Sequence, residues 1–167
     1  MKKFLQKKLK NEKGMTLIEL LAVIVIIAII AAIAIPAISN IIDNSRVGAI
    51  KSDAQNVMSA SELYFLDYPS EDDVTLEKLV DEGYVEDIGS FEDPTTAGTI
   101  STVTVDKATP AVTGGTPVAA KGVSITGTGV VGKVQVEFAA AERNDIQAYA
   151  NSFREASTNG TVTATKN

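Results

Sequence analysis

The stretch from Lys13 to Ile42, KGMTLIELLAVIVIIAIIAAIAIPAISNII, decides the fold. No residue from Leu20 to Ile42 is charged. At about 1.5 Å per residue this run forms a helix of roughly 35 Å, and the hydrocarbon core of a bilayer is about 30 Å thick. The sequence therefore predicts a helix that can span a membrane close to the N-terminus.

Charge is distributed unevenly on the two sides of Gly14. Residues 1–14 contain six Lys and one Glu, whereas residues 15–167 contain nine Lys or Arg and twenty Asp or Glu. A basic segment before an apolar run is typical of a cytoplasmic end beside an anionic membrane face. The acidic remainder suits a soluble part on the other side of the membrane. It argues against direct nucleic-acid binding, which needs clustered Lys and Arg.

Two residue types that are missing from the chain limit the disulfides and metal sites that it can form. The chain has no Cys and no His. This excludes disulfides and metal sites built on thiolates or imidazoles, and we expect no cofactor.

Residues 43–67 keep a helical spacing but become amphipathic. The apolar stripe consists of Ile50, Ala54, Val57, Ser61 and Tyr64, with Met58 and Phe65 beside it. The charged residues Asp43, Arg46, Lys51, Asp53 and Glu62 lie mostly off the stripe. Because proline disfavours a helical residue before it, Tyr68-Pro69 predicts the end of one long helix that starts at about Thr16.

Residues 69–167 read as a small globular head. A short helix is predicted at 75–82 with its end at Gly83, and helical composition returns at 139–156. Segments rich in Thr and Val predict strands at Thr99–Val105, Val118–Ile125 and Val130–Phe138. Turns are expected at Pro94, Pro110, Gly114, Gly115, Pro117 and Gly127. The end, Thr161–Asn167, is either an edge strand or a frayed tail.

The nine residues from Lys13 to Leu21, KGMTLIELL, resemble the class III signal of type IV pilins and pseudopilins. That signal has a short basic leader, a glycine, an apolar first residue of the mature chain, and then Thr-Leu-Ile-Glu-Leu. The resemblance is close over residues 1–42 and general over 43–67. Many members have Phe where this chain has Met15.

The resemblance implies an α+β fold, in which a long N-terminal helix packs on a small antiparallel sheet of three or four strands. The composition divides the chain into a leader (1–14), a membrane and filament-core helix (15–42), an amphipathic continuation (43–68) and an extracytoplasmic head (69–167). The resemblance further implies that a prepilin peptidase cuts after Gly14 and that Met15 becomes an N-methylated N-terminus.

Glu19 is the acidic residue that the family keeps within its apolar helix, and the same role follows from the residues themselves. A carboxylate near the start of an apolar span is costly unless it is paired. The amine of Met15, freed by cleavage on a neighbouring subunit, is the natural partner, so Glu19 would gate assembly. The alternative is an interfacial carboxylate that reaches the lipid headgroups.

Pro36 lies where many members of the family have a helix-breaking proline. It removes one helical hydrogen bond, so it predicts a kink or a segment that unwinds when the subunit leaves the bilayer. The alternative is a tolerated membrane-helix proline.

Weaker features are found in the head. Glu71-Asp72-Asp73 and Glu92-Asp93 could bind a cation, but the absence of ordered ligand spacing favours solvated acidic loops. Asn159-Gly160-Thr161 fits an N-glycosylation pattern that chance explains equally well.

The sequence leaves four functions to consider. The first is a structural subunit of a type IV pilus-like filament, and the second is a pseudopilin of a competence or type II secretion system, which shares every motif above. The third is a secreted or membrane-anchored binding protein, cut at Ala32-Ile33-Ala34 to leave Ile35 as its first residue. The fourth, an enzyme, has no nucleophile system, phosphate loop or carboxylate pair in its favour.

The filament function implies a specific set of partners and locations. The partners are the prepilin peptidase, further copies of the chain and other pilins, the membrane and, indirectly, an assembly platform with its ATPase. The precursor would be a single-pass protein of the cytoplasmic membrane, and the assembled subunit would lie on the cell surface.

Overall fold

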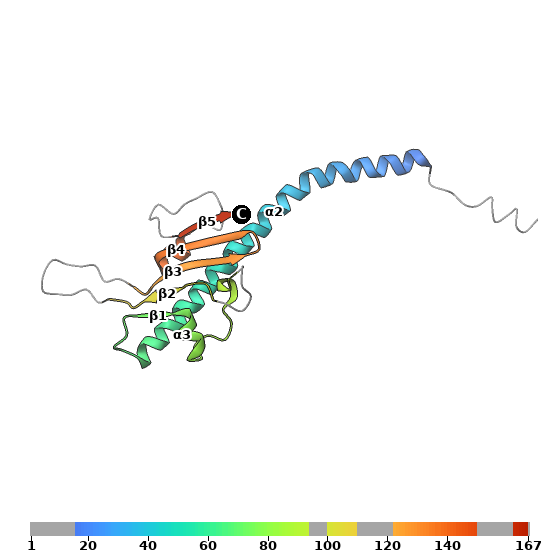
Figure 1. Cartoon of the computed structure of the whole chain (residues 1–167). Helices are drawn as coiled ribbons and strands as arrows, with labels where there is room; N and C mark the ends of the chain where they lie inside the picture. The colour runs from blue at the N-terminus through green and yellow to red at the C-terminus, as the bar shows by residue number, and fades with distance from the viewer. Residues whose placement is uncertain (1–15, 94–99, 110–121, 150–161, 167) are drawn as a thin grey trace, which may run out of the picture. The chain divides into compact units, whose positions relative to one another are not determined.

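The structure is a computed structural model that describes residues 16–93, 100–109, 122–149 and 162–166. Its longest element is helix α2, Leu17–Asp67, of 51 residues (Figure 1). This confirms the predicted single helix and its end before Tyr68-Pro69. The chain forms two compact units, Met1–Ile41 and Ile42–Asn167.

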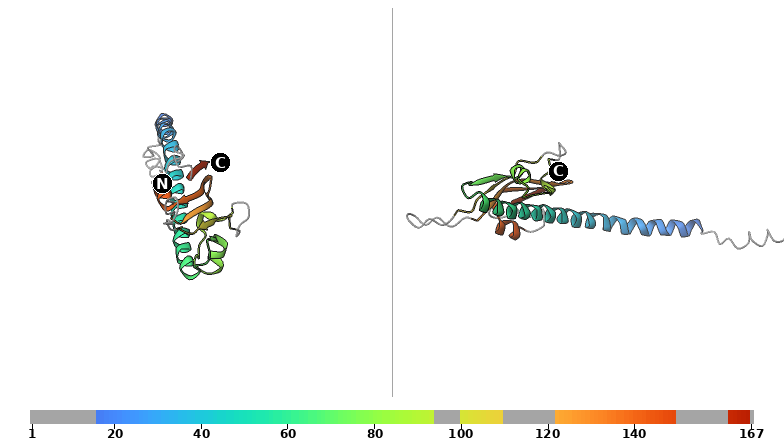
Figure 2. Two further views of the ribbon diagram at one scale, coloured as in Figure 1. Left: turned by 90° about the vertical axis from the view of Figure 1, so that its left-hand side faces the viewer. Right: turned by 90° about the horizontal axis from the view of Figure 1, so that it is seen from below.

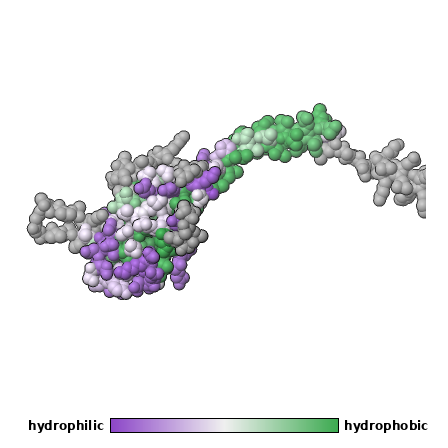
Figure 3. All heavy atoms as spheres, in the orientation of Figure 1, coloured by the Kyte–Doolittle hydropathy of each residue, from purple (hydrophilic) through white to green (hydrophobic). Residues whose placement is uncertain are grey.

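The described part of the first unit is a helix that is apolar around its whole circumference. Its large side chains are exposed, from 48% for Val25 to 88% for Leu17. Figure 3 shows this segment as mostly hydrophobic. Among the described residues, α2 alone is long and apolar enough to cross a membrane. A helix with no polar face needs lipid or other helices around it.

The second unit contains a five-stranded antiparallel sheet in the order β1-β2-β3-β4-β5. The strands are β1 (Asp73–Thr75), β2 (Thr104–Asp106), β3 (Ser124–Val131), β4 (Val134–Glu142) and β5 (Val162–Lys166). The sheet lies along the outer part of α2 (Figure 2). The short helices are α3 (Leu76–Asp81), α4 (Arg143–Ala148) and the 3-10 turn η1 (Gly89–Phe91). The predicted α+β class is confirmed, with five strands instead of three or four.

The predicted stripe on α2 forms one side of the core. Its members Ile50, Ala54, Val57, Ser61 and Tyr64 are all buried, as are Met58 and Phe65. All of them except the polar Ser61 belong to one apolar cluster with side chains from every strand, including Val74, Val105, Ile125, Phe138 and Val162. Asp43 was expected off the buried stripe, but it is only 3% exposed, and its Oδ1 lies 3.1 Å from Nη1 of Arg46.

The predicted boundaries of the central strands are wrong. Gly127 was expected to be a turn, yet β3 runs through it, and the hairpin turn follows Val131 instead. The register shifts between Ile125 and Gly127, and a Cβ on Gly127 would lie 2.8 Å from Val103 Cγ2. A Cβ on Gly129 would lie 2.5 Å from Ile50 Cγ2. These glycines therefore allow close packing within a strand.

The remaining head elements follow the prediction in part. Helix α3 is confirmed, and Gly83, with φ +78°, ends it in a Schellman motif in which Tyr84 N–H donates to Leu79 O. The helix predicted at 139–156 is wrong at its start, because residues 139–142 complete β4 and α4 begins only at Arg143. The edge-strand alternative for the C-terminus is confirmed by β5.

Several of the predicted features fall wholly or partly outside the described residues. These are the turns at Pro94, Pro110, Gly114, Gly115 and Pro117, the first part of the strand at Val118–Ile125, and the end of the helix at 139–156. Within the described part of Thr99–Val105, the strand begins only at Thr104.

Candidate processing and assembly site

Three hydrogen bonds close the first turn of α2. The backbone N–H and the hydroxyl of Thr16 each donate to Glu19 Oε2 at 2.8 Å. The backbone N–H of Glu19 donates to Thr16 Oγ1 at 3.3 Å. This reciprocal arrangement is a capping box, with Thr16 as the N-cap and Glu19 as the third helical residue. It places the carboxylate at the positive end of the helix dipole, which favours a negative charge.

The capping box satisfies hydrogen bonds but does not neutralise the charge of Glu19. Both donors belong to the neutral residue Thr16. Glu19 is the only charged residue from Thr16 to Ile42, and the next basic residue along the chain is Arg46. Its surroundings on the helix are apolar and exposed, with Leu17 at 88%, Ile18 at 74% and Leu20 at 51% exposure. A carboxylate in such a segment needs a cation from another chain or contact with water.

The other expected site residues are placed only in part. Gly14 and Met15 lie outside the described residues, directly before the N-cap. Pro36 lies inside α2. Since proline has no N–H, the carbonyl of Ala32 lacks its usual helical donor. The unwinding assigned to Pro36 stays a prediction.

In the head, two lysines contact the acidic segment Glu71-Asp72-Asp73. The side-chain ammonium of Lys107 donates to the backbone carbonyls of Pro69 and Glu71, and the backbone N–H of Lys107 donates to Asp72 O at 2.8 Å. Lys78 Nζ lies 3.7 Å from a carboxylate oxygen of Glu71. Among the described residues, no group of three or more Asp or Glu could hold a metal ion. Asn159-Gly160-Thr161 lies outside them.

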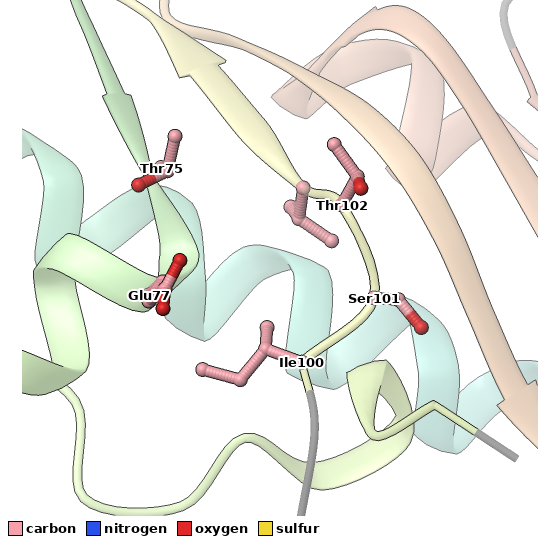
Figure 4. Close-up of a pocket in the computed structure, with 6 residues that line it drawn as sticks. Thr75, Glu77, Ile100, Ser101 and Thr102 are labelled. Atoms are coloured by element: carbon pink, nitrogen blue, oxygen red, sulfur yellow. The ribbon is translucent and has the colours of Figure 1, made fainter. Parts of the chain in front are cut away.

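One small pocket of the head lies between α3 and the chain that leads into β2. Figure 4 shows Thr75 and Glu77 on one side and Ile100 to Thr102 on the other, and Val103 also lines the pocket. Glu77 is its one carboxylate, so the lining offers hydroxyls and a single acid. This is no constellation for acid–base or nucleophilic chemistry.

A comparison with protein families agrees with the geometry at the start of α2. A family model described as the prokaryotic N-terminal methylation motif matches residues 9–35. This chain carries the class III signal of type IV pilins and pseudopilins. No curated protein and no solved structure matches it.

The class III signal supports a precursor of the pilin or pseudopilin type, a structural subunit rather than an enzyme. The signal also implies processing by a prepilin peptidase and assembly into filaments. Together with the apolar helix, it fits a precursor that is anchored in the membrane and a product on the cell surface.

The hydrogen bonds between Thr16 and Glu19 are not among the features predicted from the sequence, where Thr16 is only a member of the signal motif. The signal was present, because Thr followed three positions later by Glu, directly before an apolar run, is the pattern of a capping box.

Proposed function

We propose that the chain is the precursor of a structural subunit of a type IV pilus-like filament. A membrane prepilin peptidase cuts between Gly14 and Met15, and Met15 is then N-methylated. Residues 15–42 leave the bilayer and become part of the filament core, while the head faces outward.

The observation that carries this proposal is the lone carboxylate of Glu19 on an exposed apolar helix. Large apolar side chains cover the helix on all sides, and in a filament they would be covered by the same segments of other copies. Bringing these helices together in a dry core would leave Glu19 as an uncompensated charge. The α-amine of Met15 on a neighbouring copy is the cation that cleavage creates at this end of the helix. A buried charge without its partner is strongly unfavourable. Only a register that places the amine of Met15 beside Glu19 of the next copy avoids this cost, so the pair fixes the register of the copies.

The capping box is compatible with this pairing. Glu19 Oε2 accepts both bonds from Thr16, and Oε1 takes part in none of the three. Glu19 can therefore cap its own helix and face a cation at the same time, since a carboxylate has about four acceptor positions.

The test replaces Glu19 with Ala or Gln in cells that make the filament. We expect both variants to be inserted and cleaved, because the peptidase acts before assembly, but to yield at least tenfold fewer filaments in sheared fractions. Glu77→Ala, which removes an exposed carboxylate from α3, is the matched control and should assemble normally. A normal filament yield from Glu19→Gln would contradict the role of Glu19.

The same filament preparation distinguishes a pilin from a pseudopilin. Long surface filaments in which this chain is the main component would support a pilus. A chain that is processed but stays in the cell envelope would support a pseudopilin.

A further inference from the structure

We propose that Thr16 is a positioning residue for leader cleavage, because its side chain stops helix α2 two residues after the bond that is cut. This inference rests on the proposed function, since it concerns the cleavage between Gly14 and Met15. It assigns to Thr16 a role that differs from the assembly role of Glu19.

The hydrogen bonds of the first turn show how the helix is stopped. In a helix that continued toward the leader, the N–H of Glu19 would donate to the carbonyl of Met15, four residues earlier. It donates instead to the hydroxyl oxygen of Thr16. The N–H of Thr16, which would reach the carbonyl of Glu12 in such a helix, donates to Glu19 Oε2. The first helical bond runs from Leu20 N–H to Thr16 O at 3.1 Å.

The position of this stop matters for the peptidase. Cleavage requires access to the carbonyl carbon of Gly14. If the helix extended through the leader junction, that carbonyl would accept the N–H of Ile18 and would be enclosed by side chains of the adjacent turns. A glycine at position 14 already disfavours helix, and the threonine cap adds a second, directional stop. Together they favour a junction that can enter an active site in an extended form.

The geometry separates the contribution of Thr16 from that of Glu19. Glu19→Ala removes the carboxylate but keeps the backbone N–H of residue 19, so the hydroxyl of Thr16 can still cap the helix. Thr16→Val keeps the shape of the side chain and the carboxylate of Glu19, but it removes the cap. Cleavage should therefore depend on residue 16, and assembly on residue 19.

The experiment measures the rate of leader removal from the full-length precursor in membrane vesicles that contain the prepilin peptidase. We expect Thr16→Val and Thr16→Ala to slow cleavage about fivefold, which corresponds to the loss of an N-cap worth about 1 kcal/mol. Thr16→Ser and Thr16→Asn should be cut at the wild-type rate, because Ser and Asn are at least equally good caps. Glu19→Ala should slow cleavage less than Thr16→Val does, because it removes the carboxylate from the capping box but leaves the hydroxyl of Thr16 to cap the helix.

Two results would overturn the inference. Wild-type cleavage of Thr16→Val would show that the cap is not needed. Slow cleavage of Thr16→Asn, equal to that of Thr16→Val, would show that the peptidase recognises threonine itself rather than the helix stop. Failure of the proposed function would give a different result, because the wild-type precursor would then not be cut after Gly14 at all. Equal resistance of all variants to alkaline extraction from the membrane controls for insertion.

Discussion

Gly89 combines two constraints at one residue. Its φ is +54°, and a Cβ at this position would lie 2.6 Å from Asp53 Oδ2. The same carboxylate oxygen accepts the N–H of Ser90 at 2.9 Å and so holds the start of η1 against α2. A side chain at residue 89 would therefore strain the backbone and also displace Asp53 from its hydrogen bond.

We expect Gly89→Ala to lower the free energy of unfolding of the head by about 2–3 kcal/mol, the sum of a left-handed residue and a lost hydrogen bond. Gly83 provides the matched control, because its φ is +78° but no atom lies within 4 Å of its Cβ position. Gly83→Ala should cost only the left-handed backbone penalty of about 1–2 kcal/mol. Urea unfolding followed by circular dichroism, on precursor solubilised in detergent, measures both values. Equal losses would mean that the contact with Asp53 contributes nothing.

Residues whose role is local could be predicted from the sequence, and residues with distant partners could not. Glu19 stands out because it interrupts an apolar run, and Thr16 belongs to a pattern that spans only four positions. The burial of Asp43 and the contact of Gly89 with Asp53 depend on segments far apart in the chain. No periodicity in the sequence reports such contacts.

At the scale of elements, tyrosine–carboxylate bonds tie the end of α2 to the turn after α3. Tyr84 donates its hydroxyl to Asp67 Oδ2 at 2.5 Å, and Tyr68 donates to Glu82 Oε2 at 3.5 Å. The hydrogen bond to Asp67 raises the pKa of Tyr84 to about 12, from an ordinary value of about 10. The carboxylate of Glu82 also raises the pKa of Tyr68.

These shifts predict that the head loses stability at high pH. Because the pKa of Tyr84 is higher in the folded than in the unfolded chain, its contribution is complete below about pH 10 and is lost as the pH rises through about 12. We expect the urea concentration at the unfolding midpoint of the wild type to decrease as the pH rises from about 10 to about 12. The midpoint of Tyr84→Phe should decrease less over the same pH range. Identical pH profiles would show that the bond between Tyr84 and Asp67 does not stabilise this junction.

The elements differ in how well the sequence predicts them, and the reason is the length of their periodic signal. Helix α2 joins a long apolar run to an amphipathic stripe, and together they span 51 residues, so its existence and its end could both be predicted. Three of the strands have only three to five residues, and β3 contains two glycines. Gly127 and Gly129 are typical of a turn, but here they allow β3 to approach Val103 and Ile50. Which function a glycine serves depends on what packs against it.

At the scale of the whole molecule, the chain combines a basic leader, an exposed apolar helix and an acidic head. In the function that we propose, the leader keeps the precursor oriented in the membrane, and the apolar helix is stable only in lipid or among other helices. Removing the leader would take away the positive charges that retain the chain on the cytoplasmic side, and it would expose the amine that we propose as the partner of Glu19. Cleavage would thus convert a membrane protein into a subunit that can assemble.

The most direct test of this account is the N-terminal residue of the chain in filaments sheared from the cell surface, determined by mass spectrometry. The account predicts a chain that begins at Met15 and carries one additional methyl group on its α-amine. A chain that retains residues 1–14, or one that begins at Ile35 after conventional signal cleavage, would contradict it, because Glu19 would then have no α-amine beside it to pair with.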